Sequence, residues 1–204
     1  MSNFTQNDLT LNKIPFVHSF MIDETVCDGL ISYYKESSYK GPGAVGLVGQ
    51  TGQEVSTFSK VSTDVSISIH DNNEQISAYR KQLFTGIDEY KERYPALSDN
   101  IWFWGVDEPF NIQHYEPNQG YLTWHCERAR PKSNNRLLVF MTYLNDVSDG
   151  GQTEWEYLGL SVVPVKGLTI IWPTDWMYLH RGVTSPTQIK TIATGWFSFL
   201  HEQQ

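Results

Sequence analysis

The sequence predicts a mainly β fold of the α+β class, with N-terminal helices that support a β-rich C-terminal half. Its 204 residues fit a single domain. Aromatic residues make up 14% of the chain, and every tryptophan lies between Trp102 and Trp196. Beyond residue 101, short runs rich in Val, Ile, Thr and aromatic residues alternate with turn clusters. We therefore expect one domain over 1–204, with 1–100 as helical and strand support and 101–204 as the core.

The first hundred residues predict two helices and two strands. Residues 14–20 are typical of a strand, and Asp23 is a good N-cap for a helix that runs to about Glu36. Residues 60–70 alternate as a strand does, whereas 73–94 place apolar residues at helical spacing. The glycine-rich segment 37–57 between them predicts a long loop, which is either a lid over bound substrate or an ordinary surface loop.

The second half predicts short, closely spaced strands. Their sequences are FNIQHY (110–115), GYLTWH (120–125), RLLVFMTYL (136–144), GQTEWEY (151–157), LSVVPV (160–165), GLTIIW (167–172) and TIATGWFSFL (191–200). The turn clusters EPNQ, NDVSDGG, KG and PTDW separate them. This spacing indicates a β-sandwich or jelly roll with the helices packed on one side.

Charge and cysteine content exclude several classes of protein. The formal net charge of -8 argues against binding of duplex nucleic acid, which needs a basic face. Cys27 and Cys126 lie too far apart for a CxxC motif, so neither a disulfide scaffold nor a Cys-ligated zinc site is expected. The start of the sequence has no signal-peptide pattern and no run is apolar enough for a membrane helix, so we expect a soluble cytoplasmic protein. A local basic cluster consists of Arg128, Arg130, Lys132 and Arg136. It is a candidate binding site for an acidic substrate, but we favour a solvated hairpin.

Two histidines, a glutamate and a lysine in the C-terminal half have the spacing of a candidate metal and cosubstrate site. On a strand, His125 and Glu127 point to the same side, because residues i and i+2 share a face. A second histidine, His180, follows 53 residues after Glu127. Two histidines and one carboxylate form the facial triad of non-haem iron(II) oxygenases, which leaves open metal positions. Lys190 comes ten residues later, and its charge suits the far carboxylate of a dicarboxylate cosubstrate.

Four segments carry a resemblance to a known family: QHYEPNQGYLTWHCE, LVFMTYLNDVSDGGQTEW, GLTIIWP and HRGVTSPTQIKTIATGWFSF. Over about 110–200, the chain resembles the double-stranded β-helix core of iron(II)/2-oxoglutarate-dependent dioxygenases. It is most similar to their prolyl 4-hydroxylase-like branch. The order Tyr115, Gly120, Tyr121, His125 follows that branch's Tyr–Gly–Tyr–His pattern.

The resemblance implies a role for each candidate residue. Fe(II) is expected on His125, Glu127 and His180, with no catalytic residue beyond the metal site. Lys190 is expected to pair with the distal carboxylate of 2-oxoglutarate, and Tyr115 and Tyr143, on neighbouring strands, to hydrogen-bond the cosubstrate. Tyr121 and Trp196 are expected at the substrate mouth. Ordinary core packing is the alternative for these aromatic residues, and it is equally favoured for Tyr121 and Tyr143. Ascorbate is the expected reductant.

Two departures from the family pattern concern the metal ligands and the cation. Glu127 stands where the family usually has Asp, and its extra methylene requires a shift of the strand or of the metal. Arg181, directly after His180, is an alternative partner for the cosubstrate. A strand neighbour points to the opposite face, so Lys190 is favoured. Cys126, between two ligands, is expected to point away from the metal.

The resemblance thus implies a dioxygenase that hydroxylates an unactivated C–H bond and releases succinate and CO2. A prolyl residue in a peptide or protein is the favoured substrate, with no membrane partner. Three alternatives stay open: the same chemistry on another side chain, a nucleobase or a small molecule; a zinc hydrolase; and a non-enzymatic jelly-roll binding module. The zinc hydrolase is disfavoured because the sequence has no HExxH helix and zinc chemistry gives Lys190 no role.

Overall fold

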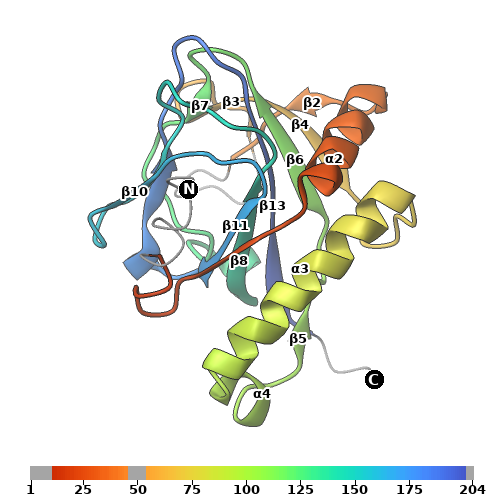
Figure 1. The fold of residues 1–204 in the computed structure, drawn as a ribbon. Helices are drawn as coiled ribbons and strands as arrows, with labels where there is room; N and C mark the ends of the chain where they lie inside the picture. Colours follow the sequence, from red (N-terminus) through yellow and green to blue (C-terminus); the bar gives the residue numbers. More distant parts are fainter. Residues whose placement is uncertain (1–10, 46–53, 201–204) are drawn as a thin grey trace, which may run out of the picture.

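The computed structural model describes residues 11–45 and 54–200, and shows a mainly β fold. A large antiparallel sheet carries two helices on one face and shorter strands on the other (Figure 1). Among the described residues, no helix is long and apolar enough to span a membrane.

The large sheet has eight strands, and its order is β1-β11-β8-β13-β6-β4-β2, with β5 also paired to β13. The strands are β1 (His18–Met21), β2 (Gly41–Pro42), β4 (Thr63–Ile67), β5 (Trp104–Gly105), β6 (Phe110–Tyr115), β8 (Arg136–Tyr143), β11 (Leu168–Pro173) and β13 (Lys190–Phe199). β13 is central, and it pairs Lys190 with Tyr115 on one side and Ile192 with Tyr143 on the other. Tyr115 and Tyr143 therefore flank β13, which corrects the expectation that their strands are neighbours.

The smaller strands lie on the face of the sheet away from the helices. A three-stranded sheet has the order β10-β9-β12, from Leu160–Val162, Thr153–Trp155 and His180–Gly182. A two-stranded sheet pairs β3 (Lys60–Val61) with β7 (Gly120–Tyr121). Two 3-10 turns, η1 (Pro131–Ser133) and η2 (Trp176–Tyr178), complete this side.

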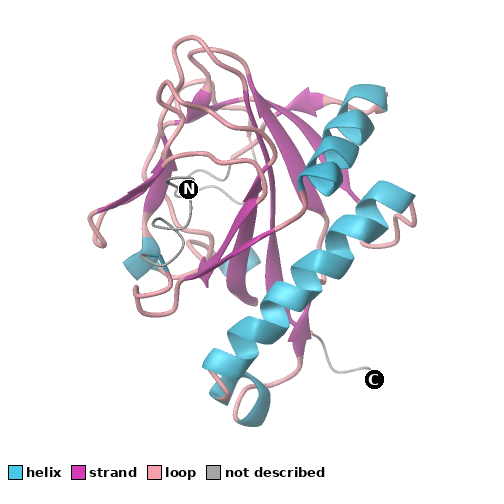
Figure 2. Cartoon of the chain, viewed as in Figure 1, coloured by secondary structure: helices cyan, strands magenta, loops and turns pink. Residues whose placement is uncertain are grey.

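Two helices cover the other face of the sheet, as Figure 2 shows. α2 (Glu24–Glu36) follows Asp23, and α3 (Glu74–Arg93) is capped by Asn73, whose side chain accepts from the backbone N–H of Gln75. The short α4 (Ala96–Asp99) follows Pro95. Both long helices match the predicted spans, because their apolar spacing and caps are local signals.

The large sheet is buried on both faces. Along β8, Leu138 and Phe140 belong to the core beneath the helices, whereas Val139, Met141 and Tyr143 belong to the core on the other side. Strands that are covered on both faces lose the polar alternation of a half-exposed sheet. This explains why the segment 136–144 is an almost continuous apolar run.

Several predicted strands are shorter or divided in the structure. The first begins only at His18, because a turn precedes it and Phe16 has a positive φ of 58°. The run 60–70 divides into β3 and β4, which pair with different partners, β7 and β6. β7 covers only Gly120 and Tyr121, and the backbone N–H of Leu122 extends its pairing with β3 by one bond to the carbonyl of Ser59.

The N-terminal half does more than support the core. β1 pairs with β11 and β4 pairs with β6, so strands from both halves form one sheet. Of the predicted loop 37–57, residues 46–53 lie outside the described residues, and the lid prediction falls partly on them. The flanking Val45 and Glu54 form an isolated antiparallel bridge.

Candidate metal centre

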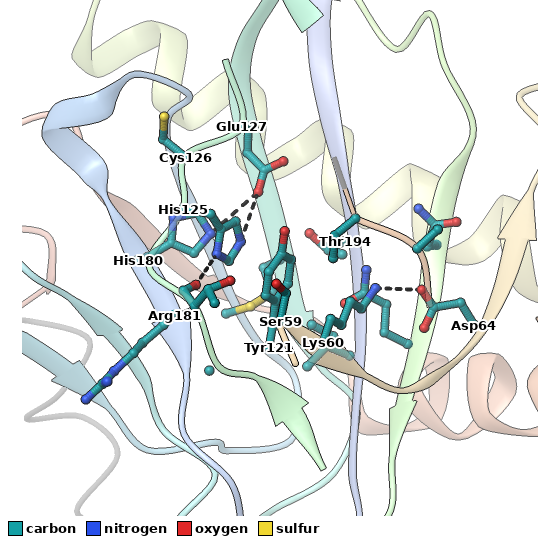
Figure 3. A pocket seen from close by; sticks show the side chains of 18 of the residues that line it. Ser59, Lys60, Asp64, Tyr121, His125, Cys126, Glu127, His180, Arg181 and Thr194 are labelled. Carbon is teal, nitrogen blue, oxygen red and sulfur yellow. Dashed lines mark hydrogen bonds and ion pairs between the residues drawn. The ribbon is translucent and has the colours of Figure 1, made fainter. Parts of the chain in front are cut away.

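Three predicted ligand residues meet at one point between the large sheet and the smaller strands. His125, Glu127 and His180 each offer a ligand atom, and all these atoms lie within 4.8 Å of one another. Oε1 of Glu127 lies 3.5 Å from Nε2 of His180 and 3.7 Å from Nε2 of His125. Figure 3 shows the three side chains converging.

Backbone pairing brings the two histidines together. His125 and His180 form an isolated antiparallel bridge, in which each backbone N–H donates to the other's carbonyl at 2.9 Å. His180 is the first residue of β12, whereas His125 lies four residues beyond the end of β7. Residues that lie 55 positions apart in the sequence are thereby held as direct neighbours.

Each imidazole is oriented by its other nitrogen. Nδ1 of His125 contacts the carbonyl of Thr123 at 2.9 Å, and Nδ1 of His180 contacts the carbonyl of Tyr178 at 3.0 Å. A carbonyl oxygen only accepts, so each Nδ1 carries the proton and donates. Both Nε2 atoms then present a lone pair towards Glu127, as metal-ligating histidines do.

Burial keeps the donor set in the state that a metal requires. Burial and the neighbouring His180 lower the pKa of His125 to about 3, so its imidazole is neutral near pH 7. Burial alone would raise the pKa of Glu127, but its contacts with His180, His125 and Arg136 hold the pKa below its usual value. A neutral His125, a Glu127 carboxylate and the Nε2 atom of His180 form a donor set that fits a divalent metal of the iron(II) class.

The second oxygen of Glu127 is held by two donors. Oε2 accepts from Nε1 of Trp196 at 2.8 Å and from Nη1 of Arg136 at 3.4 Å. The Arg136 guanidinium lies 3.4 Å from the Trp196 ring centroid and also donates twice to Glu108, at 2.7 and 2.6 Å. Arg128 pairs with both carboxylate oxygens of Asp175. The expectation of a solvated hairpin is therefore wrong for these two arginines, which tertiary partners hold.

The candidate metal cluster of His125, Glu127 and His180 opens into a cavity of about 990 Å³. Lys190, Tyr115, Tyr121 and Trp196 line it, together with all three ligand residues. Tyr143 is not among the lining residues, and its hydroxyl donates to Thr153, which does line the cavity. The roles predicted for these four aromatic residues stay predictions.

Lys190 is a buried cation in this cavity. It begins β13, is 4% exposed and donates to the carbonyls of Gly151 at 3.0 Å and Val183 at 3.3 Å. Burial lowers its pKa to about 8. No ion pair of Lys190 occurs within the described part of the chain, and an ammonium group has three donors. One N–H of Lys190 therefore remains for a bound acceptor.

The neighbours of the ligands settle two further expectations. Arg181 pairs with Glu154 and stacks on Trp124, and Figure 3 shows it pointing away from the metal cluster. The same figure shows the Cys126 thiol directed away from the ligand atoms, as expected. Tyr121 stacks on the His125 ring, with centroids 3.6 Å apart and planes 10° from parallel.

Sequence reasoning missed one charged pair in the cavity. The ammonium of Lys60, whose side chain is 2% exposed, lies 2.7 Å from a carboxylate oxygen of Asp64. Both residues line the cavity, and Figure 3 shows the pair facing it. The signal in the sequence was weak, because a Lys and an Asp four residues apart usually lie on a solvated surface.

Comparison with known proteins gives one family. Residues 110–198 match the model of the 2OG-Fe(II) oxygenase superfamily. The alpha-3 subunit of human prolyl 4-hydroxylase is 34% identical over 97 residues, which are 44% of this chain and 17% of that protein. The chicken alpha-2 subunit is 26% identical over 90 residues, 41% of this chain and 17% of that protein. The chain thus spans less than a fifth of the length of these curated relatives.

Solved structures share the fold across almost the whole chain. The viral collagen prolyl hydroxylase of Paramecium Bursaria Chlorella virus-1, in complex with 2OG, has a TM-score of 0.64 and 20% identity, and covers 92% of this chain and 98% of its own. A prolyl-4-hydroxylase of Pseudomonas putida has a TM-score of 0.68 and 15% identity, with coverage of 96% and 98%. A Trichoplax adhaerens prolyl hydroxylase is bound to a peptide fragment of the hypoxia inducible factor oxygen degradation domain. It has a TM-score of 0.68 and 12% identity, and covers 98% of this chain and 94% of its own.

Proposed function

Because the chain belongs, through residues 110–198, to the 2OG-Fe(II) oxygenase superfamily, we propose that it is an Fe(II)- and 2-oxoglutarate-dependent dioxygenase. It hydroxylates an unactivated C–H bond, and its favoured substrate is a prolyl residue in a peptide or protein. The whole of 1–204 acts as one domain with a double-stranded β-helix core. The observation that carries this proposal is that the metal cluster and the buried Lys190 share one cavity.

His125, Glu127 and His180 would hold the iron. Their donor set fits, because each histidine presents an unprotonated Nε2 and Glu127 presents Oε1. Three protein ligands leave positions for a cosubstrate and for O2. When bound, iron and 2-oxoglutarate supply the oxidising chemistry, in which O2 and 2-oxoglutarate yield succinate, CO2 and one oxygen atom for the substrate C–H bond.

The protein's own residues orient the cosubstrate. Lys190 offers its third N–H to the distal carboxylate of 2-oxoglutarate, while the carbonyls of Gly151 and Val183 fix the ammonium. A charge pair in a dry site is strong and directional. The Tyr115 hydroxyl donates to Gln113 at 2.6 Å and is a further candidate for the cosubstrate, and Tyr143 would act next to Thr153.

A peptide or protein substrate is favoured over a small molecule. The curated relatives are prolyl 4-hydroxylase subunits, and one structural relative holds a peptide fragment. The cavity has the volume of a site for a cosubstrate together with part of a second molecule. Its aromatic wall, with Tyr121 and Trp196, suits an apolar ring such as that of proline. Ascorbate is the reductant that we propose for the iron.

An anaerobic titration tests the proposal. Fe(II) and 2-oxoglutarate are added to metal-free protein, and the visible charge-transfer band of the chelated keto acid is recorded. We expect the band in the unchanged protein and in the control His70→Ala. His70 is exposed and does not line the cavity. The band should disappear in His180→Ala.

A substrate screen completes the test. Proline-containing peptides are incubated with the loaded protein, and mass spectrometry follows the gain of one oxygen atom together with succinate release. If the unchanged protein gives no charge-transfer band, the oxygenase proposal fails. If the band forms and no proline peptide gains oxygen, only the prolyl substrate is refuted.

A further inference from the structure

The two oxygens of Glu127 have different surroundings. Oε1 faces the Nε2 atoms of the two histidines, at 3.5 and 3.7 Å. Oε2 points the other way, to the indole N–H of Trp196 at 2.8 Å and to Arg136 at 3.4 Å. Such hydrogen bonds to a charged acceptor are stronger than neutral ones. The carboxylate therefore has one oxygen free for a metal and one that is already bound.

The two donors are themselves fixed. Trp196 lies within β13 and Arg136 begins β8, two paired strands of the large sheet. The Arg136 guanidinium lies over the Trp196 ring and donates through two nitrogens to Glu108. The side chains of Arg136 and Glu127 are only 14% and 15% exposed. Neither donor can move without losing a second interaction.

This arrangement answers the problem of side-chain length. Glu127 has one methylene more than the Asp that is usual in the family, and its terminal torsion is intrinsically broad. A freely turning carboxylate would lose that freedom on metal binding. Because Oε2 is already hydrogen-bonded to Trp196, the Glu127 carboxylate has lost this torsional freedom before a metal binds. Aspartate would set the carboxylate back by about 1.5 Å, the length of one C–C bond, and so take its outer oxygen away from the indole.

We propose that Trp196 and Arg136 are positioning residues that hold Oε2 of Glu127, so that only Oε1 is presented to the metal, and that this clamp adapts the site to glutamate. The inference rests on the proposed function, because it presumes that Glu127 is a ligand. It also gives Trp196 a task other than lining the substrate mouth. Its N–H is committed to Glu127 and one ring face is covered by Arg136.

A double-mutant cycle on Co(II) binding tests the clamp without turnover. Trp196→Phe replaces the indole by a phenyl ring, which Arg136 can still cover but which has no N–H for Glu127. We expect the dissociation constant for Co(II), measured by calorimetry, to rise about 10- to 100-fold, as for other residues that orient metal ligands. The visible Co(II) bands should also change, because the ligand field depends on how Glu127 binds. In a Glu127→Asp background, the same substitution should change the constant by less than about twofold, because the partner is already out of reach.

Trp176→Phe is the matched control. Trp176 is 65% exposed, does not line the cavity and makes no hydrogen bond to Glu127. We expect its Co(II) affinity to be unchanged. If Trp196→Phe fails to give the circular dichroism spectrum of the unchanged protein, Arg136→Lys takes its place, since it keeps the charge but loses the planar fork.

The outcomes are distinguishable. If the unchanged protein takes up Co(II) and Trp196→Phe binds it equally well, the clamp is refuted while the metal site stands. An equal loss of affinity in the unchanged and Glu127→Asp backgrounds also refutes it, because the effect then does not pass through Glu127. If the unchanged protein takes up no Co(II), the metal site and the proposed function both fail.

Discussion

Replacing Lys190 by methionine separates the function of this residue from its contribution to stability. The ammonium is 4% exposed and has two carbonyl acceptors but no acidic partner within the described part of the chain. Lys190→Met keeps an unbranched apolar side chain as far as Cε and removes the ammonium group. We expect binding of 2-oxoglutarate to weaken strongly while the protein remains folded.

The magnitude follows from burial. The pKa of Lys190 falls from 10.5 to about 8 because burial penalises the charged form. At 1.36 kcal/mol per pKa unit, this is about 3 kcal/mol held against the charged form in the folded protein. A bound carboxylate offsets that penalty, so Lys190→Met should weaken 2-oxoglutarate binding by about 100-fold.

Stability should change much less. At neutral pH the charged Lys190 destabilises the folded state, because its folded pKa lies below its unfolded value. Methionine removes this penalty and leaves the carbonyls of Gly151 and Val183 without their donor, at about 1–3 kcal/mol. The two effects oppose each other, so we expect a shift in the free energy of unfolding of less than about 2 kcal/mol.

Calorimetry of 2-oxoglutarate with the Mn(II)-loaded protein measures the effect, and urea unfolding measures stability. Pyruvate is the chemical control. It has the same 2-oxo acid group as 2-oxoglutarate but no distal carboxylate, so it should bind both proteins equally. Lys132→Met, which removes an exposed lysine on the cavity lining, is the matched variant and should bind normally. Affinity for 2-oxoglutarate within about threefold of the unchanged protein would refute the pairing with Lys190.

Three further predictions concern pH, a glycine and a helix cap. The affinity for 2-oxoglutarate should fall as pH rises above about 8, because Lys190 loses its proton there in the free protein, and calorimetry at pH 7 to 9 should find this slope absent in Lys190→Met. Gly150→Ala should destabilise the protein by more than about 2 kcal/mol in urea unfolding, since Gly150 has a φ of +80° and a Cβ there would lie 2.4 Å from the Thr184 carbonyl oxygen. Gly159→Ala, where φ is +57° and nothing lies within 4 Å, is its control and should cost about 1 kcal/mol; equal losses at both glycines would contradict the clash. Asn73→Ala should lower the free energy of unfolding by about 1 kcal/mol through loss of the α3 cap, and an unchanged urea midpoint would contradict it.

The helices and most strands were predictable because their signals are local. The apolar spacing in 73–94 and the stop at Pro95 define α3 within a residue or so. The run 110–115 matches β6, and 136–144 matches β8 but for its last residue. The predicted strand bounds were wrong where pairing with a distant segment determines the length of a strand. The segment 120–125 is apolar enough for one strand, yet only Gly120 and Tyr121 form one, while His125 pairs separately with His180 of β12.

The candidate ligands were predictable for a related reason. His125 and Glu127 are two residues apart, and His180 with Lys190 has a recognisable spacing, so a pattern in one dimension was sufficient to nominate them. Whether the three ligand atoms come within reach of one metal depends on the backbone bridge between His125 and His180. No local propensity encodes that bridge, because it joins distant parts of the chain.

The sequence by itself determined the mainly β fold class, the two long helices and the residue types of the candidate metal centre, since periodicity, caps and motif spacing are properties of short segments. Only the tertiary structure decided which partner each charged group has. Arg136 and Lys60 were indistinguishable from solvated residues until the sheets placed Glu127 and Asp64 beside them. The interaction of a charge depends on distance and burial, and both are fixed by packing between segments far apart in the sequence.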